Sequence, residues 1–325
     1  MIDSFGRQQR YLRVSVTNRC DLRCFYCVSP RGFQTMPVSS RLSIKEIAHL
    51  VDIFSTMGVE KVRLTGGEPL MRDGILDLVA ELAANPRIKT LAMTTNGTRL
   101  RHIARDLRRS GLRALNISLD SLRSDRFERI AGRNKMRHVL AGIDEALAAG
   151  FTTLKLNVVV MRGVNDDELA DFVAFVRDKP IELRFIEFMP FSDNGWNERR
   201  LVPCQEMIDS LSEHYHLLPR LNADPSSTAR LFSIEGWTGS IGFIPSMTLA
   251  FCGACNRLRL LADGSLKTCL FTPPSINLRD LLRLGASDQA IREQIHASVA
   301  GKPPEHPPLE SLADFSSQEM TRIGG

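Results

Sequence analysis

Short apolar runs alternate with longer segments of helical period between residues 11 and 188. The runs are rich in β-branched residues and end at turn residues, which is typical of buried strands. Six of them are expected to be strands: LRVSVT (12–17), KVRLT (61–65), TLAMTT (90–95), ALNISL (114–119), LKLNVVV (154–160) and ELRFIEF (182–188). Between them, apolar residues three and four positions apart predict helices, as at residues 43–57 and 74–84. Ser43, Asp73 and Asp166 are the expected helix caps.

Strands that alternate with helices predict a parallel sheet with right-handed crossovers. Two architectures fit this pattern, an open doubly wound sheet and a curved partial (βα) barrel. Both place their active sites at the carboxyl ends of the strands. The segments that follow the six expected strands are CDLRCFYC, GGEP, TNG, DS, GVND and MPFSDNG. Polar and glycine-rich residues are therefore expected to gather at this one edge of the sheet.

The pattern changes after about residue 196. Residues 221–230 are expected to be a loop, residues 231–270 short strands with a turn at Asp263-Gly264, and residues 277–300 two helical segments. The proline-rich segment GKPPEHPPLE (301–310) is expected to be a surface wrap or linker. The predicted organisation is a core of residues 1–195 followed by a C-terminal α+β region of residues 196–325.

Composition adds limits to this picture. The chain has 325 residues, of which 43% are hydrophobic and 24% charged, and this is ordinary globular composition. It shows neither a signal peptide nor an apolar stretch of about 18 residues, so a cytoplasmic location is expected, with no membrane partner. The net charge of +5 is spread along the chain. It does not indicate nucleic acid, for which a concentrated basic stripe is expected, and it suits a small anionic substrate.

Seven cysteines are the main chemical signal. Cys20, Cys24 and Cys27 form one group, Cys252, Cys255 and Cys269 form a second, and Cys204 stands alone. In the cytosol, thiols persist as metal ligands, catalytic groups or buried core rather than as disulfides. Two triads of thiols therefore indicate two metal centres, and Cys204 is interpreted as an inert buried thiol.

The spacing within the triads favours iron-sulfur clusters. Three thiolates in CxxxCxxC can hold three irons of a [4Fe-4S] cube and leave the fourth iron open, whereas a structural zinc site needs four protein ligands. Zinc or unrelated thiols remain the alternatives for the first triad. For the second triad a zinc ribbon without one partner is the alternative, and Cys204 could complete that site.

CDLRCFYC followed by GGEP resembles the radical S-adenosylmethionine (SAM) superfamily. That resemblance implies a partial (βα)6 barrel, with SAM bound at the open iron and cleaved to a 5′-deoxyadenosyl radical. Further strings resemble one family within it, the GTP 3′,8-cyclases of molybdenum cofactor biosynthesis: YLRVSVTNRC, KVRLTGGEPLMR, TTNG, NISLDSL, LKLNVVVMRGVND, RFIEFMPF, CGACNRLRLLADGSLKTCL and the terminal Gly-Gly. These strings extend over nearly the whole chain.

The family resemblance assigns roles to individual residues. It implies a first [4Fe-4S] cluster at Cys20, Cys24 and Cys27 and a second at Cys252, Cys255 and Cys269. It implies SAM contacts at Tyr26, Gly67, Glu68, Ser118 and Met189. It implies GTP contacts at Arg13, Lys61, Arg63, Thr94, Lys155, Arg184, Arg257, Leu258 and Arg259, and a C-terminal tail, Gly324 and Gly325, that enters the active site. No residue is assigned as a catalytic acid or base.

The implied reaction is that of a radical lyase. The adenosyl radical abstracts the C3′ hydrogen of GTP, C3′ attacks C8 of the guanine, and a further reduction gives (8S)-3′,8-cyclo-7,8-dihydroguanosine 5′-triphosphate. The implied partners are an electron donor, a cyclic pyranopterin monophosphate synthase that uses the product, and a second subunit in a homodimer. The alternatives are a radical SAM enzyme with an auxiliary cluster that acts on a peptide, and a zinc-binding interaction module.

The chain departs from the family pattern beside the first triad. Val28-Ser29-Pro30 follows Cys27 where the family usually has Met-Pro, and Asn18 and Asp21 stand where Asp and Asn are more frequent. These residues lie between or beside the expected ligands, so we expect the cluster to be kept and only its surroundings to differ.

Overall fold

The computed structural model of the chain describes residues 1–28, 36–191, 194–221, 224, 226–249, 251–307 and 320–324. The strands are β1 (Tyr11–Ser15), β2 (Lys61–Thr65), β3 (Thr90–Thr95), β4 (Ala114–Ser118), β5 (Thr153–Val160), β6 (Ile181–Glu187), β7 (Leu218–Arg220), β8 (Arg230–Ser233), β9 (Ser240–Ile244), β10 (Arg257–Leu260), β11 (Ser265–Lys267) and β12 (Ile276–Asn277). The α-helices are α1 (Ile44–Thr56), α2 (Ile75–Ala83), α3 (Leu100–Arg109), α4 (Ser124–Ala131), α5 (Met136–Ala148), α6 (Leu169–Val176), α7 (Cys204–Ser212), α8 (Leu278–Arg283), α9 (Asp288–Ala300) and α11 (Met320–Ile323).

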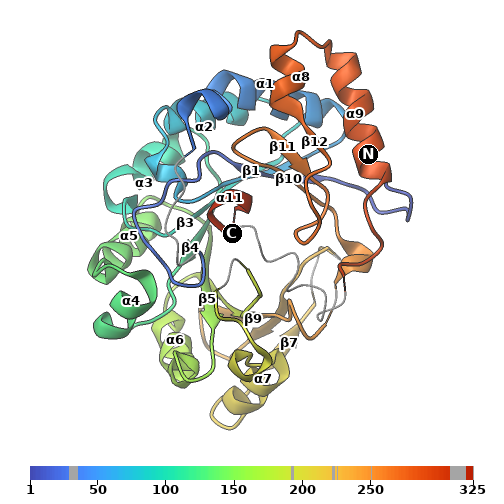
Figure 1. The fold of residues 1–325 in the computed structure, drawn as a ribbon. Coiled ribbons are helices and arrows are strands. Elements are labelled where there is room, and N and C mark those ends of the chain that lie inside the picture. Colours follow the sequence, from blue (N-terminus) through green and yellow to red (C-terminus); the bar gives the residue numbers. More distant parts are fainter. Residues whose placement is uncertain are drawn as a thin grey trace.

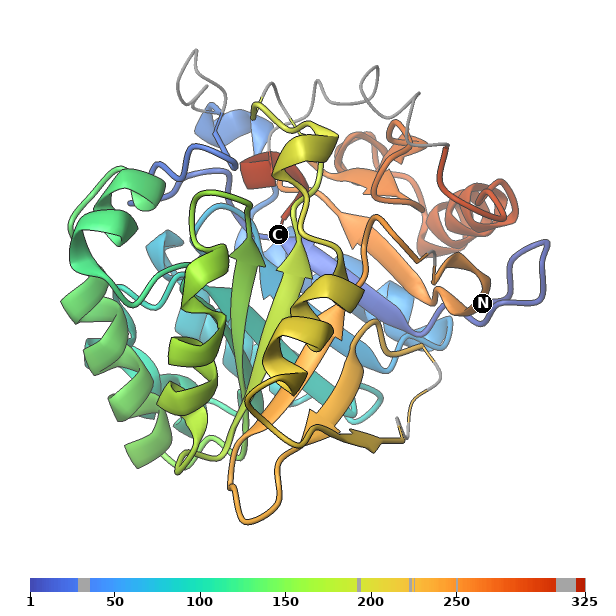
Figure 2. The ribbon, with the colours of Figure 1, turned by 90° about the horizontal axis from the view of Figure 1, so that it is seen from below.

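The strand order decides between the two architectures. β1 to β6 are parallel and follow one another in chain order across the sheet, whereas a doubly wound sheet reverses its order at a switch point. The six expected strands therefore form a partial (βα)6 barrel. In Figure 1 the helices form an outer ring around the strands, and α11 lies inside the ring. Figure 2 shows the same helix near the edge to which the arrowheads of the parallel strands point.

Strands from the C-terminal region extend the barrel on both sides. β10 pairs with β1 in parallel and continues into antiparallel β11 and β12, whereas β9 pairs with β6 in parallel and continues into β8 and β7. The expected short strands between residues 231 and 270 are confirmed, as are the two helical segments, which are α8 and α9. The division of the chain at residue 195 stays a prediction.

Alternation along β5 and β6 gives the barrel a polar interior. Every second residue of β6 is fully buried, and the residues between, Glu182, Arg184 and Ile186, are half-buried. β5 shows the same alternation, with Lys155 and Asn157 at the half-buried positions. Because successive side chains of a strand point to opposite faces, the fully buried set, apolar except for Glu187, packs away from the barrel interior, and the half-buried set, which carries Lys155, Asn157, Glu182 and Arg184, faces it.

The helix caps were predicted with mixed success. Ser43 caps α1 and forms a capping box with Glu46, as expected. The N-cap of α2 is Gly74 in a left-handed conformation, not Asp73. Asp166 lies inside a 3₁₀ turn (Asp166–Glu168) that precedes α6, so it is not the cap of that helix. In both cases an additional turn precedes the helix, and periodicity does not reveal such turns.

The surface wrap expected for the proline-rich segment stays a prediction. Of residues 301–310, those up to 307 are described; Gly301, Pro304 and Glu305 are exposed, whereas Lys302 is only 3% exposed. Cys204 is buried at the start of α7. Within the described part of the chain, every helix is too short or too polar to span a bilayer.

Candidate active site

The first triad lies in the loop after β1. Cys20, Cys24 and Cys27 line one pocket. The amide of Arg23 donates to the carbonyl of Ala131 at 2.8 Å, and the amide of Phe25 donates to Ile130 at 3.1 Å. The end of α4 therefore holds the cysteine loop in place.

The electrostatics of this pocket suit a cationic group. Burial raises the pKa of Cys20 to about 12, with further contributions from Glu68 and Asp21. Burial and the neighbouring thiols also hold the pKa values of Cys24 and Cys27 well above their ordinary range. Three thiols whose negative charges would repel one another are stabilised as thiolates by bound metal. The donor set of the first pocket therefore fits the iron-sulfur cluster that the sequence implies.

The two glycines of GGEP allow the turn after β2 to lie close to the loop that follows β1. A Cβ on Gly66 would lie 2.3 Å from the carbonyl oxygen of Thr17, and one on Gly67 would lie 2.3 Å from that of Arg19. The amides of Gly67 and Glu68 donate to these same two carbonyls at 2.8 and 2.7 Å. The glycines thus allow the turn after β2 to pack directly against the loop that carries the first triad.

Glu68 lies behind this pocket rather than on its lining. Its carboxylate is fully buried and accepts hydrogen bonds from the amide of Leu70 at 3.0 Å, the hydroxyl of Thr95 at 2.7 Å and the amide of Asn96 at 2.7 Å. Burial raises the pKa of Glu68 to about 7, although these hydrogen bonds oppose the rise. A direct contact between Glu68 and SAM stays a prediction, and the observed contacts position residues 95 and 96.

The other expected SAM residues surround two adjoining pockets. Tyr26, Gly67 and Ser118 line the first pocket, and Met189 lines its neighbour. The hydroxyl of Tyr26 donates to Asp120 at 2.5 Å, and the other Asp120 oxygen accepts from the amide of Val159 at 2.8 Å.

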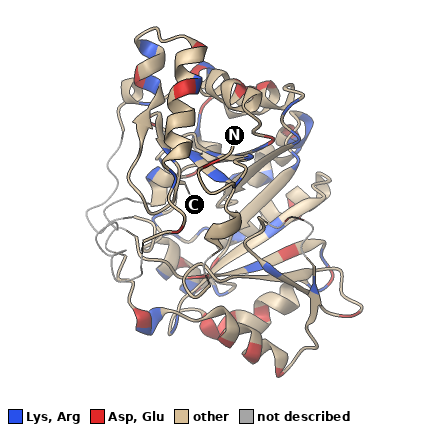
Figure 3. Cartoon of the chain, turned by 90° about the vertical axis from the view of Figure 1, so that its right-hand side faces the viewer, with Lys and Arg blue, Asp and Glu red and all other residues tan. Residues whose placement is uncertain are grey.

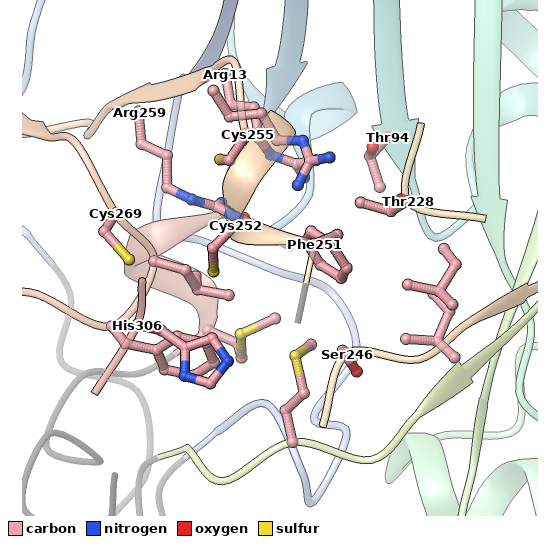
Figure 4. A pocket seen from close by; sticks show the side chains of 18 of the residues that line it. Arg13, Thr94, Thr228, Ser246, Phe251, Cys252, Cys255, Arg259, Cys269 and His306 are labelled. Atoms are coloured by element: carbon pink, nitrogen blue, oxygen red, sulfur yellow. Dashed lines mark hydrogen bonds between the residues drawn. The ribbon is translucent and has the colours of Figure 1, made fainter. Parts of the chain in front are cut away.

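The second triad lines the neighbouring pocket. Figure 4 shows Cys252, Cys255 and Cys269 on one side of this pocket, with Arg13 and Arg259 beside them. Thr94 lies across from the thiols in this view and also lines the first pocket, so the two pockets adjoin. Within the described ranges, no three His, Cys, Asp or Glu side chains are grouped so that they could hold a single metal ion. A cubane cluster has a different requirement, because each cysteine binds a different iron.

Cations from five strands meet in a third hollow, which borders the second pocket. Its lining includes Arg13, Lys61, Arg63, Lys155, Arg184, Arg257 and Arg259. The strand register explains the grouping, because Arg13 stands directly between Arg63 and Arg259. Burial, together with neighbouring cations, lowers the pKa of Arg13 to about 10 and that of Arg259 to about 9. Figure 3 shows basic residues, in blue, on strands around the C-terminus. This concentration of charge suits a polyanionic ligand.

Part of this charge is already balanced. Glu182 accepts from Lys155 at 2.8 Å and from Arg184 at 2.5 Å, so these two cations are held side by side on β5 and β6. Arg259 donates to the carbonyl oxygens of Gly324 at 2.7 Å and Ile323 at 3.3 Å. These bonds bring the C-terminal segment to the cations.

The backbone conformation and the close packing at residue 324 require a glycine. Gly324 has a φ of 75°, and a Cβ would lie 2.6 Å from the side chain of Thr65. Gly324 lines the second pocket. Gly325 lies outside the described residues, as do Ser29 and Pro30 of the departure from the family pattern.

Sequence reasoning missed several residues of these pockets. Tyr11 accepts from Arg63 Nε at 2.5 Å and lines the cationic hollow, and its position two residues before Arg13 could have revealed it. Asn116 and Asn157 line the second pocket from β4 and β5. The side chain of Leu258 is fully buried in the core, so only its backbone can reach a nucleotide.

Comparison with known proteins places the chain in a family. Residues 14–176 match the radical SAM superfamily, and residues 181–308 match the family described as Molybdenum Cofactor Synthesis C. The chain is 46% identical to "GTP 3′,8-cyclase, mitochondrial" of Arabidopsis thaliana, over 100% of this chain and 83% of that protein. It is 41% identical to "GTP 3′,8-cyclase" of Syntrophomonas wolfei, over 100% of both.

One further relative is about twice as long as this chain, and one solved structure shares its fold. "Molybdenum cofactor biosynthesis protein 1" of Mus musculus is 44% identical over 100% of this chain, which spans about half (51%) of that protein. The crystal structure of Streptococcus suis SuiB superposes with a TM-score of 0.63 at 13% identity, over 95% of this chain and 68% of that chain. At this identity the likeness shows the fold alone.

The partial barrel and the CxxxCxxC loop at its carboxyl edge define a radical SAM enzyme. Within that superfamily, the chain belongs to the GTP 3′,8-cyclase family. The cofactors of this family are SAM and two [4Fe-4S] clusters, and the chain has one cysteine triad for each cluster.

Proposed function

We propose that this chain converts GTP to (8S)-3′,8-cyclo-7,8-dihydroguanosine 5′-triphosphate, the first step of molybdenum cofactor biosynthesis. The observation that carries the proposal is a cationic hollow that borders the pocket of the second cysteine triad. Thr94 lines both this pocket and the pocket of the first triad. A triphosphate offers the negative charge that seven grouped cations require. The family membership supports the same reaction.

In this proposal the first pocket holds SAM. Cys20, Cys24 and Cys27 are the ligands of the first cluster, and Tyr26, Gly67, Ser118 and Met189 lie around the cofactor. When bound, the cluster and SAM supply an electron and a carbon radical that can abstract hydrogen from the substrate ribose. The Glu68 carboxylate accepts hydrogen bonds from Leu70, Thr95 and Asn96. Its role in the proposal is therefore to position these residues.

The second pocket and the cationic hollow orient GTP. Arg13, Arg63 and Arg259 bind the phosphates from three adjacent strands, with Lys61, Lys155, Arg184 and Arg257 around them. Cys252, Cys255 and Cys269 would hold the second cluster, which would supply a binding site for the guanine. This arrangement directs the ribose toward Thr94, which lines both pockets.

The C-terminal segment shields the reacting atoms from water. Ile323 is 1% exposed and packs with Phe191, Met247, Leu261 and Phe271 in an apolar cluster. The next residue, Gly324, lines the pocket and is bound to Arg259. In the proposal, Gly324 closes the cavity over the bound nucleotide, because a radical reaction requires the exclusion of water and oxygen.

The test is an anaerobic incubation of the reconstituted protein with dithionite and SAM, with and without GTP. We expect 5′-deoxyadenosine to form in amounts that depend on GTP, together with the cyclised nucleotide. If the amount of 5′-deoxyadenosine does not depend on GTP, the peptide-modifying alternative is favoured. That alternative does not explain the grouped cations. A colourless zinc protein under the same conditions would contradict both radical functions.

The proposal also includes partners, a location and a domain boundary. An electron donor, a cyclic pyranopterin monophosphate synthase downstream and a homodimer belong to it as expected partners, and a location in the cytoplasm is the expectation from the sequence. One relative is named as mitochondrial. The boundary at residue 195 is likewise proposed.

A further inference from the structure

Lys302 is a buried lysine at the second cysteine triad. It follows α9 and is only 3% exposed. Its ammonium donates to Gln9 Oε1 at 2.7 Å and to the carbonyl oxygens of Arg257 and Cys255 at 3.0 and 3.2 Å, and it lies 3.6 Å from Cys255 Sγ. A buried ammonium is costly unless acceptors surround it. These three oxygen acceptors hold the charge against the thiol.

Gln9 determines where the ammonium lies. The Gln9 side chain is fully buried, and its Nε2 donates to Asp3 Oδ2 at 3.0 Å and to the carbonyl of Arg7 at 3.1 Å. Because these acceptors take the amide protons, Oε1 faces Lys302 and accepts from it. Asp3 therefore sets the orientation of the Gln9 amide and, through it, the position of the lysine.

Arg7 fastens the same N-terminal segment to the triad. Its Nε donates to Asp3 Oδ2 at 2.6 Å, and its Nη1 donates to the carbonyl of Cys252 at 2.9 Å. The guanidinium also donates to the carbonyls of Pro303 and Pro304 at 2.6 and 2.7 Å. Residues 3–9 and 302–304 thus form one wall that contacts two of the three cysteines.

The charge of this wall acts on the thiol of Cys255. The Lys302 ammonium lies 3.6 Å from Cys255 Sγ and donates to the carbonyl of the same residue at 3.2 Å, so its positive charge stands at a ligand sulfur. A positive charge and an N–H donor at a ligand sulfur stabilise the reduced, more negative state of an iron-sulfur cluster. A contact of this kind therefore raises the reduction potential of the cluster.

We propose that Lys302, oriented by Gln9, is a positioning residue that holds the Cys255 thiolate for the second cluster and raises the reduction potential of that cluster. The inference rests on the proposed second cluster at Cys252, Cys255 and Cys269. It goes beyond the cyclase reaction because it assigns a residue that controls one of the two clusters and leaves the other unaffected.

The test compares three variants of the full chain. Lys302→Met removes the charge and the donor, Lys302→Arg keeps the charge, and Lys45→Met alters an exposed lysine of α1 as a control. Each protein is reconstituted anaerobically, and the potentials of both clusters are measured by redox titration followed by electron paramagnetic resonance. We expect Lys302→Met to shift the second cluster to a more negative potential and to leave the first unchanged. Lys302→Arg should shift it less, and Lys45→Met should shift neither.

Some outcomes would contradict only the role of Lys302, and another would contradict the second cluster site itself. An unchanged second potential in Lys302→Met, or an equal shift of both clusters, would overturn the inference alone. If Lys302→Met loads only the first cluster while Lys302→Arg loads both, the positioning role is supported, because Lys302→Arg keeps the charge and the N–H donors that Lys302→Met removes. If both variants lose the second cluster, Lys302 only packs the wall and the inference fails. A wild-type protein without a second cluster would overturn the proposed site itself.

Discussion

The two cysteine triads have the same number of thiols but differ in the charged groups beside them. Burial raises the pKa of Cys252 as it does in the first triad, and the contrast lies at Cys255. Asp21 and Glu68 raise the pKa of Cys20, and Asp120 does so for Cys24 and Cys27, in addition to the effect of burial. At the second triad, Lys302 and Arg257 lower the pKa of Cys255 below its ordinary value, against the effect of burial. Acidic neighbours disfavour added electrons and basic neighbours favour them. The first cluster should therefore be the stronger reductant.

The strand register gives this difference a structural origin. β10 runs parallel to β1 with Arg257 beside Tyr11, so Cys252 and Cys255 lie toward the amino end of β1. Cys20 follows the carboxyl end of the same strand, where the GGEP turn brings Glu68. One strand thus separates an acidic end, suited to reductive cleavage of SAM, from a basic end, suited to a nucleotide.

The largest effects are expected from single cysteine changes in each triad. Cys24→Ala removes a ligand of the first cluster, so formation of 5′-deoxyadenosine should fall below detection although GTP still binds. Cys252→Ala should leave the first cluster and SAM binding intact and abolish the change in the spectrum of the second cluster on addition of GTP. Iron content, calorimetry and product analysis measure these effects. A GTP-induced spectral change that survives in Cys252→Ala would contradict the division between the triads.

The next largest effect concerns Arg13, which stands between Arg63 and Arg259. A hydrogen bond to a charged group contributes about 1.5–3 kcal/mol, so Arg13→Met should weaken GTP binding by about 10- to 150-fold. SAM binding, measured by calorimetry on the same protein, should be unchanged. Arg137→Met, at an exposed position of α5, is the control and should alter neither affinity. An equal loss for both ligands would show that Arg13 supports the barrel as a whole.

A smaller, pH-dependent effect is expected from Tyr11. Burial alone would raise the pKa of the Tyr11 phenol, but Arg63, Arg13 and Lys61 lower it to about 7. Above this pH the phenolate adds a negative charge to the hollow, so GTP affinity should fall as the pH rises through 7, by at most about tenfold per pH unit. Tyr11→Phe should remove this fall.

The measurement for Tyr11 is the ratio of the GTP dissociation constants of wild type and Tyr11→Phe at each pH. Titration of the nucleotide itself cancels in this ratio. SAM affinity should follow the same pH profile in both proteins, since Tyr11 lines the cationic hollow and is not among the residues that line the first pocket. A constant ratio for GTP between pH 6 and 9 would disprove the titration of Tyr11.

Sequence alone predicted the features that depend on short stretches of chain. The six barrel strands and the cysteine loop follow from period, composition and spacing, because each is contained in a few consecutive residues. Lys302 was missed because its partner Gln9 is 293 positions away, and a proline-rich segment resembles a surface linker. The cap at Asp73 was wrong because Gly74 supplies a left-handed turn that apolar periodicity does not reveal.

The smallest effect is expected from Glu68→Gln, the counterpart at the first triad of the change at Lys302. Burial raises the pKa of Glu68 to about 7, so at pH 8 the carboxylate is largely ionised and adds negative charge near Cys20. Glutamine keeps the size and removes the charge, so the potential of the first cluster should become more positive while the second stays unchanged. In the wild type, the backbone amide of Asn96 donates to the Glu68 carboxylate. In Glu68→Gln, the side-chain amide group of glutamine places a second donor against this backbone amide. The free energy of unfolding should therefore fall by about 1–3 kcal/mol.

Glu81→Gln, at an exposed position of α2, is the matched control and should change neither the stability nor either potential. Thermal unfolding and the same redox titration measure both effects in the reconstituted protein. If Glu68→Gln holds both clusters and the first potential does not move, the acidic end of the barrel does not set the reducing power of the first cluster. The contrast between the triads would then depend on the basic end alone, and Lys302→Met would be the change that brings the two potentials closer together.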